Sequence, residues 1–229
     1  MTEMELRQKI VRTMQGWMGA SKGDTMHKDI LDTYNAYRPL ARGYALVTDD
    51  NYCAATVSAA WIKNGCAPYT GTECSCGELI RIAKSRGIWI EADDHRPEIG
   101  DALLYAWADS GKGDNTTGHD HIGIVSVSSG DILTVIEGNR TGGKVGTRRI
   151  AVNGRYIRGY ICPDYKAIAA SLSASSWARD AAYWAVHTGV FQGDGAGNLH
   201  WQEPVTREQL ALILMRFEKR IGGCFPLFF

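Results

Sequence analysis

Cys53 is the residue of this sequence best placed to act as a nucleophile. It lies in the stretch DDNYCAATVSAAWI (49–62), where a polar segment leads into an apolar one and a helix is expected to begin. The first turn of a helix carries free N–H groups and partial positive charge, which favour the thiolate form of cysteine. A thiolate attacks carbonyl carbon, so this position predicts acyl transfer, although a small buried cysteine fits the same pattern.

His121 is the expected partner of this thiol. A cysteine nucleophile needs an imidazole that takes its proton, and the imidazole needs an acceptor that fixes its tautomer. In the alternating segment HIGIVSV, His121 shares one face with Gly123 and Val125. We expect Gly123 to let another element approach closely, such as the helix that bears Cys53. His119, two residues earlier on the same face, is the alternative base and is interpreted as a loop residue near substrate.

Glu137 and Asn139 complete the candidate set. Glu137 ends the apolar run of DILTVIEGN, where burying its charge without a partner costs several kcal/mol, so a partner such as imidazolium is expected. The turn predicted at 128–131 pairs the two strands and places Glu137 opposite or diagonal to His121.

The elements that must position these residues change type along the chain. Helices are expected before Gly87, two of them opened by the capping boxes Thr2–Glu5 and Ser75–Glu78, and the third capped by Asp50 or Asn51. After Gly87 the apolar period becomes two. The expected strands are IWIE, DALLYAW, HIGIVSV, DILTVIEGN, KVGTRRIAV and YIRGYICP. Helices followed by antiparallel strands predict an α+β domain over residues 1–163.

The C-terminal part has a different pattern. Residues 164–175 are rich in Ala and Ser and are interpreted as a linker. Residues 176–220 predict two helices joined by a Gly-Asp-Gly turn, the second opened by a capping box of Thr206 and Gln209. A helical hairpin of this size buries too little surface to be stable alone, so it is expected to pack on the first domain or to self-associate.

Composition excludes several classes of function. The 229 residues hold 25 Lys plus Arg and 25 Asp plus Glu, which argues against nucleic acid and anionic membranes as partners. The start, MTEMELRQKI, does not resemble a signal peptide, and no run is long enough to span a bilayer, so synthesis in the cytoplasm is expected. The cysteines Cys66, Cys74 and Cys76 lack a fourth ligand at zinc-site spacing and are interpreted as structural thiols. No metal or cofactor is expected.

Residues 4–163 resemble the CHAP domain, a papain-like cysteine amidohydrolase and peptidase fold of phage endolysins and bacterial cell-wall hydrolases. The motifs that carry this resemblance are the helix-starting cysteine, GDALLYAW, HIGIV and IEGN. The resemblance implies that Cys53 is the nucleophile, His121 the general base, Glu137 the orienting acid and Asn139 an additional polar residue. Some CHAP enzymes carry a calcium-binding Asp-x-Asp ahead of the cysteine, but Asp49 and Asp50 are adjacent and too near it.

The implied substrate is an amide bond of peptidoglycan in a Gram-positive cell wall. Either the N-acetylmuramoyl–L-alanine amide or a peptide bond of the stem or cross-bridge fits, because CHAP enzymes cleave both. Candidate substrate contacts are Tyr52, Trp107 and His119, although aromatic residues near the motifs also suit the core. An endolysin made without a signal peptide would act on the wall after release through a phage-made membrane lesion. The alternatives are a non-catalytic wall-binding protein and a cysteine peptidase that acts on proteins.

Residues 176–220 resemble one S-layer-homology (SLH) module. The tryptophan-alanine helix start, the Gly-Asp-Gly turn and the sequence VTREQ carry this resemblance. It implies binding of a secondary cell-wall polymer, with Arg207 at the binding groove. Such modules normally work as three copies and this chain shows one, so a homo-oligomer is expected if the module acts as an anchor.

Overall fold

The structure is a computed structural model in which residues 1–109, 116–194 and 197–221 are described. The chain divides into two compact units. The first, called the sheet unit here, spans Arg7–Pro163; the second, called the C-terminal unit, begins at Asp164 and includes Met1–Leu6. Helices and an antiparallel sheet occur together, which confirms the α+β class. The papain-like CHAP fold stays a prediction.

Helices precede the sheet along the chain. They are α1 (Glu3–Gly16), α2 (Thr25–Ala36), the 3₁₀ turn η1 (Ala41–Gly43), α3 (Cys53–Lys63), α4 (Ala67–Thr70) and α5 (Cys76–Ser85). The first capping box is confirmed, because the Thr2 N–H donates to Glu5 Oε2 at 2.8 Å and the Glu5 N–H donates to Thr2 Oγ1 at 3.2 Å. At the start of α5 the Glu78 N–H donates to Ser75 Oγ. Helix α4 was not expected.

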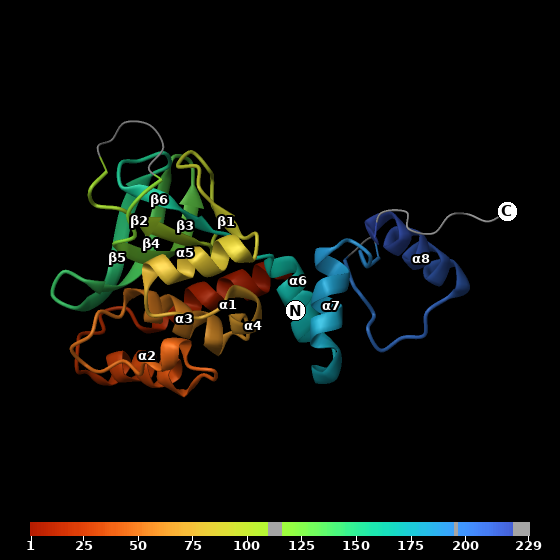
Figure 1. The fold of residues 1–229 in the computed structure, drawn as a ribbon, viewed down its shortest axis with the longest axis horizontal. Coiled ribbons are helices and arrows are strands. Elements are labelled where there is room, and N and C mark those ends of the chain that lie inside the picture. Colours follow the sequence, from red (N-terminus) through yellow and green to blue (C-terminus); the bar gives the residue numbers. More distant parts are fainter. Residues whose placement is uncertain (110–115, 195–196, 222–229) are drawn as a thin grey trace. The chain divides into compact units, whose positions relative to one another are not determined.

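Six strands form one antiparallel sheet in the order β1-β6-β2-β3-β4-β5 (Figure 1). The strands are β1 (Trp89–Ile90), β2 (Ala102–Tyr105), β3 (His121–Ser129), β4 (Ile132–Arg140), β5 (Lys144–Ala151) and β6 (Ile157–Ile161). Strands β3 and β4 pair through Ser129 and Ile132, so the turn contains only Gly130 and Asp131 and the predicted hairpin is confirmed. This hairpin holds both His121 and Glu137.

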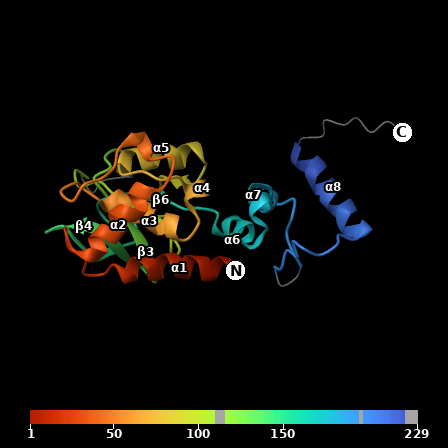
Figure 2. The same cartoon turned by 90° about the horizontal axis from the view of Figure 1, so that it is seen from below.

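Helix α3 packs against β3 and β4 in the core of the sheet unit (Figures 1 and 2). All residues from Cys53 to Trp61 are buried. The approach is close at Gly138, where a Cβ atom would lie 2.1 Å from Thr56 Oγ1. A side chain at residue 138 would therefore push α3 away from the strand that carries Glu137.

The C-terminal unit is helical. Its elements are α6 (Tyr165–Ser173), the 3₁₀ turn η2 (Ser176–Ala178), α7 (Arg179–His187) and α8 (Arg207–Ile221). Residues 165–173, interpreted from composition as part of a linker, instead form α6, which is capped by Asp164 and largely buried. Alanine is the best helix former and needs little space in a packed interface, so low apolar content misled the interpretation.

Helix α8 is amphipathic but uncovered. The capping box of Thr206 and Gln209 is present, with both reciprocal hydrogen bonds. None of residues 207–220 is buried, although they include the exposed apolar side chains Leu210, Leu212, Leu214, Met215 and Phe217. In the Gly-Asp-Gly turn Gly193 and Asp194 are described, whereas Gly195 lies outside the described residues.

Candidate active site

Cys53 is the first residue of α3. The residue before the helix is Tyr52, and no side chain caps the helix. This corrects the expected caps: Asp50 accepts hydrogen bonds from the Val47 N–H and the Tyr44 hydroxyl, and Asn51 binds another side chain. The first-turn N–H groups are therefore left without a capping side chain and can stabilise negative charge at the Cys53 sulfur.

Tyr52 does not offer a surface to substrate. Its side chain is fully buried, its hydroxyl donates to Gly143 O at 2.9 Å, and its ring packs edge-on against His27 at 4.4 Å. The expectation that Tyr52 contacts substrate is therefore wrong. Its carbonyl accepts from the Thr56 N–H and hydroxyl, so Tyr52 anchors the start of α3 and, with it, the position of the thiol.

The Cys53 thiol lies against a second thiol. Cys53 Sγ and Cys76 Sγ are 3.8 Å apart, both side chains are buried, and each cysteine begins a helix. The contact with Cys76 is the largest cause that lowers the pKa of Cys53 well below its ordinary value. Burial raises this pKa, but the His121 imidazole and the Ala54 N–H lower it further. The same contact raises the pKa of Cys76, so Cys53 carries the negative charge and Cys76 keeps its proton.

His121 connects the thiol to a carboxylate. Its Nε2 atom lies 3.2 Å from Glu137 Oε2, an ion-pair distance whose angles fall outside hydrogen-bond geometry. Burial disfavours the imidazolium, but the Cys53 sulfur and the Glu137 carboxylate outweigh it and raise the pKa of His121 to about 9. Because Nε2 faces Glu137, Nδ1 is the nitrogen left to exchange a proton with Cys53. The arrangement is that of a thiolate–imidazolium pair.

Glu137 is fully buried among cationic partners. Arg148 Nε, on β5, donates to Glu137 Oε1 at 2.7 Å, and Arg140 Nε lies 3.5 Å from Oε2. Burial raises the pKa of Glu137, but His121 and Arg148, with help from Tyr105, more than offset it and keep that pKa below its ordinary value. Sequence reasoning missed Arg148. The signal for it was an arginine at alternating register in the strand after the hairpin, where Arg148 lies opposite Val135.

Gly123 makes room for Glu137 and not for α3. A Cβ atom at Gly123 would lie 2.7 Å from Glu137 Cγ and 2.6 Å from Ile136 O. The expectation that Gly123 admits the Cys53 helix is therefore wrong, since Gly138 has that role. Continuing the register from Ile124 opposite Ile136 puts Glu137 diagonal to His121, one of the two positions expected.

Asn139 is connected through Asn51 to the segment that precedes the candidate nucleophile. Its Nδ2 donates to Asn51 Oδ1 at 2.8 Å, which links the end of β4 to the segment just before α3. Its backbone adopts a φ of +54°, a left-handed conformation that asparagine tolerates well. The observed contact of Asn139 thus braces the loop that leads to Cys53.

Trp107 and His119 border the site differently. The half-exposed Trp107 ring lies 6.0 Å from the His121 ring, centroid to centroid, and stacks on Tyr105 at 5.0 Å, with the Arg148 guanidinium 5.0 Å from its centroid. His119 is exposed, and its ring lies where a side chain at Gly77 would be, at the start of α5. Of the two histidines, His121 is the one that contacts both Cys53 and Glu137.

A separate cluster in the sheet unit joins His95, Asp101 and Cys162, whose possible ligand atoms lie within 4.8 Å of one another. Both Asp101 oxygens already accept hydrogen bonds, Oδ1 from Arg7 Nη1 at 2.9 Å and Oδ2 from the Glu98 N–H at 2.9 Å. A cation here would lie next to the buried Arg7 guanidinium. The donors therefore fit a structural ion pair better than a metal.

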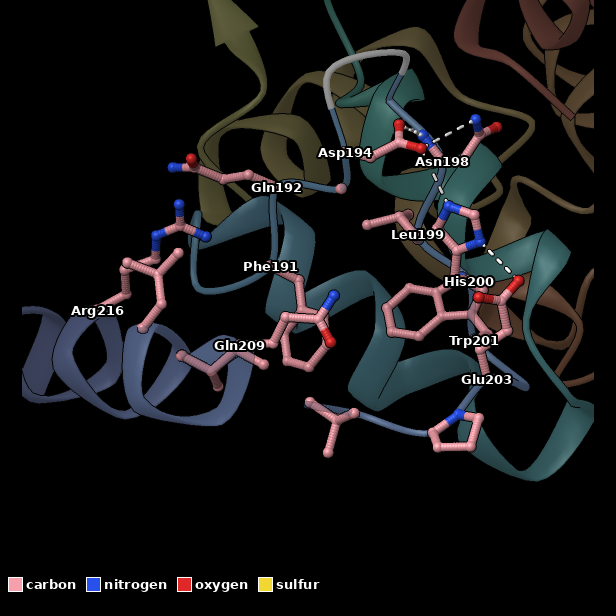
Figure 3. A pocket seen from close by; sticks show the side chains of 15 residues that line it. Phe191, Gln192, Asp194, Asn198, Leu199, His200, Trp201, Glu203, Gln209 and Arg216 are labelled. Atoms are coloured by element: carbon pink, nitrogen blue, oxygen red, sulfur yellow. Dashed lines mark hydrogen bonds and ion pairs between the residues drawn. The ribbon is translucent and has the colours of Figure 1, made fainter. Parts of the chain in front are cut away.

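The C-terminal unit has a pocket of its own, of about 540 Å³, between the segment 191–205 and α8 (Figure 3). His200 Nε2 lies 3.0 Å from Asp194 Oδ2 and its Nδ1 lies 2.7 Å from Glu203 Oε1, and these carboxylates raise the pKa of His200. Figure 3 shows Arg216 on the other side of the pocket. Arg207, the residue expected at a binding groove, is exposed at the start of α8 but does not line this pocket.

Comparison with known proteins identifies one segment. The family model of the S-layer homology domain matches residues 171–211. No curated protein and no solved structure matches the chain. The match agrees with the SLH-like module expected from sequence, and it begins within α6 and ends within α8. Through the part of the chain that is described, no helix combines the length and apolar character needed to cross a bilayer.

Proposed function

We propose that this protein is a cysteine-dependent peptidoglycan hydrolase of the endolysin type whose C-terminal module associates with the cell wall. The observation that carries the proposal is the set formed by Cys53, His121 and Glu137. A thiol at an uncapped helix start contacts an imidazole, and that imidazole lies 3.2 Å from a fully buried carboxylate. Burying three ionisable groups in contact is costly, which favours a catalytic use for them.

The proposed reaction is acyl transfer in two halves. Cys53 Sγ attacks the carbonyl carbon of the amide and forms a C–S bond, and the first-turn Cys53 N–H donates to the oxyanion. As the C–N bond breaks, His121 gives its proton to the departing amine. Water then loses a proton to His121, attacks the thioester and releases the acid and the Cys53 thiolate. Throughout, Glu137 stabilises the charged imidazole and Arg148 keeps Glu137 ionised.

The remaining neighbours suit a polymeric substrate. Trp107 gives an exposed aromatic face beside His121, which can stack on a sugar ring or cover a peptide. The amide between muramic acid and L-alanine and a bond within the peptide are both consistent with this site, so the proposal names the amide class only.

The proposed association with the wall rests on the match of residues 171–211 to the S-layer homology domain. S-layer homology domains typically bind secondary cell-wall polymers attached to peptidoglycan. The same observation favours a second candidate function, a non-catalytic wall-binding protein in which the sheet unit is a scaffold. The two differ in whether peptidoglycan is cleaved.

Mass spectrometry of the material released from purified Gram-positive peptidoglycan tests the proposal. We expect new amino or carboxyl termini from one amide bond, which also identifies that bond. Binding without released fragments would favour the scaffold function. A matched sample of Cys53→Ala controls for contaminating hydrolases.

A further inference from the structure

Cys76 is the feature of the site that the proposed reaction does not use. Its Sγ lies 3.8 Å from the Sγ of the nucleophile, within hydrogen-bond distance for sulfur, and its side chain is as buried as that of Cys53. The other described cysteines lie in different surroundings. Cys66 is fully buried, and burial raises its pKa to about 12, whereas the Cys74 thiol accepts a hydrogen bond from Arg42 Nη2 at 3.3 Å. Among the described cysteines, Cys76 is the one that contacts Cys53.

We propose that Cys53 and Cys76 form a site of reversible oxidative modification, in which peroxide converts the two thiols into an intramolecular disulfide. The sulfur atoms must approach from 3.8 Å to about 2.0 Å, and rotation about the Cα–Cβ bonds is the side-chain motion that changes this distance. Both cysteines are first helical residues, so neither sulfur is enclosed by a preceding turn of its own helix.

The chemistry balances with peroxide as the oxidant. The Cys53 thiolate attacks one peroxide oxygen, the O–O bond breaks, and Cys53 becomes a sulfenic acid while hydroxide leaves. The Cys76 sulfur then attacks the sulfenic sulfur, forming the S–S bond, and the hydroxyl leaves with the Cys76 proton as water. The two sulfur atoms lose two electrons in total, and one peroxide becomes one water and one hydroxide, which takes the proton held by the His121 imidazolium and becomes the second water. The lowered pKa of Cys53 and the raised pKa of Cys76 assign the first attack to Cys53.

A dithiol reductant reverses the modification. The disulfide has no thiolate, so on the proposed function the oxidised protein cannot form a thioester and is inactive until reduced. Cys76 would also limit damage, because it converts the sulfenic acid into a disulfide before a second peroxide oxidises it to the irreversible sulfinic acid.

The test treats the full chain with hydrogen peroxide at pH 7, blocks free thiols with N-ethylmaleimide and maps tryptic peptides without reduction. Trypsin releases Cys53 in residues 43–63, which hold no other cysteine, and Cys66, Cys74 and Cys76 together in residues 64–81. Matched variants Cys74→Ser and Cys76→Ser therefore identify the partner. We expect the cross-linked peptide pair in wild type and in Cys74→Ser, its loss on reduction with dithiothreitol, and its absence in Cys76→Ser.

Three results would overturn the inference: a cross-link that persists in Cys76→Ser, Cys53 sulfinic acid as the main product in wild type, or unmodified Cys53. Lysis is measured in parallel, and the oxidised wild type is expected to be at least about tenfold slower, with recovery on reduction. A mapped disulfide in a protein that never cleaves peptidoglycan would leave this inference standing and overturn the proposed function. Cleavage without the disulfide would do the reverse.

Discussion

At the scale of single residues, the proposed function depends first on the Cys53 thiol. Replacing Cys53 by Ala or Ser removes the nucleophile and opens little space. We expect peptidoglycan cleavage to fall by about 10⁴-fold or more, because members of a catalytic unit do not substitute for one another. The rate of fragment release measures this. The control is Cys74→Ser, which removes a thiol that accepts a hydrogen bond from Arg42. Cleavage near the wild-type rate in Cys53→Ala would disprove the proposed nucleophile.

The two neighbouring histidines give a second residue-level prediction. His121→Ala should match the loss at Cys53, since His121 is the histidine that meets both the thiol and Glu137. His119→Ala should keep measurable turnover, because its exposed ring borders the start of α5. Steady-state rates on the same wall preparation compare them, and the opposite pattern would make His119 the base.

The charged state of the site predicts a bell-shaped dependence of the cleavage rate on pH. His121, with a pKa of about 9, can protonate the leaving amine below that pH and loses this ability above it. Cys53 has a lowered pKa, so its thiolate is lost only when the pH falls through that lower value. We expect the alkaline limb near pH 9 and an acidic limb well below the ordinary pKa of a thiol. An acidic limb at pH 8 to 9 would show that Cys53 is not stabilised as thiolate.

At the scale of elements, the site depends on how closely α3 approaches β4. Gly138→Ala should destabilise the protein by about 1–3 kcal/mol, because the added methyl group would lie 2.1 Å from Thr56 Oγ1 and force the helix outward. Urea unfolding measures the change. Gly16→Ala is the matched control: a Cβ atom there meets nothing within 4 Å, so little loss is expected. Equal stability of both variants would contradict the close contact.

Local sequence signals predicted helix starts and turns better than they predicted which distant residues would be in contact. The capping boxes at Thr2 and Thr206 and the turn after Ser129 were correct, because their hydrogen bonds involve residues only a few positions apart. The contact of Cys76 with Cys53 and the ion pair of Arg148 with Glu137 were missed. Both arise from packing and strand register between segments distant in sequence, which a pattern within one segment does not encode.

Buried polar groups were predictable in part. The charge of Glu137 inside an apolar run indicated a partner, and His121 was the correct first choice. The same argument gave no reason to expect that two arginines would also surround this carboxylate. Conversely, Tyr52 was a candidate substrate contact because it is an aromatic residue near the motifs, whereas its side chain is fully buried, as are the residues that follow it in α3 up to Trp61. Proximity in sequence does not determine exposure.

At the scale of the whole molecule, binding and chemistry should be separable. Removing residues 176–221 is expected to leave cleavage of small soluble muropeptides unchanged and to weaken sedimentation with intact walls. Arg207→Ala and Arg216→Ala, measured in the full chain, distinguish the exposed start of α8 from the pocket of Figure 3. Equal pelleting of the truncated and full proteins would disprove the anchor. Precipitation of the truncated protein would instead indicate a shielding role.

The hairpin of β3 and β4 carries the base and its carboxylate, whereas the nucleophile arrives on α3 from far earlier in the chain. The low thiol pKa therefore exists only after α3 has docked both on α5, which carries Cys76, and on the hairpin, which carries His121, and an unfolded chain has the ordinary thiol value. During refolding, brief pulses of an alkylating agent at mildly acidic pH would label Cys53 only in molecules that have completed this docking. Alkylation of Cys53 thus measures when these segments, distant in sequence, have come together during folding.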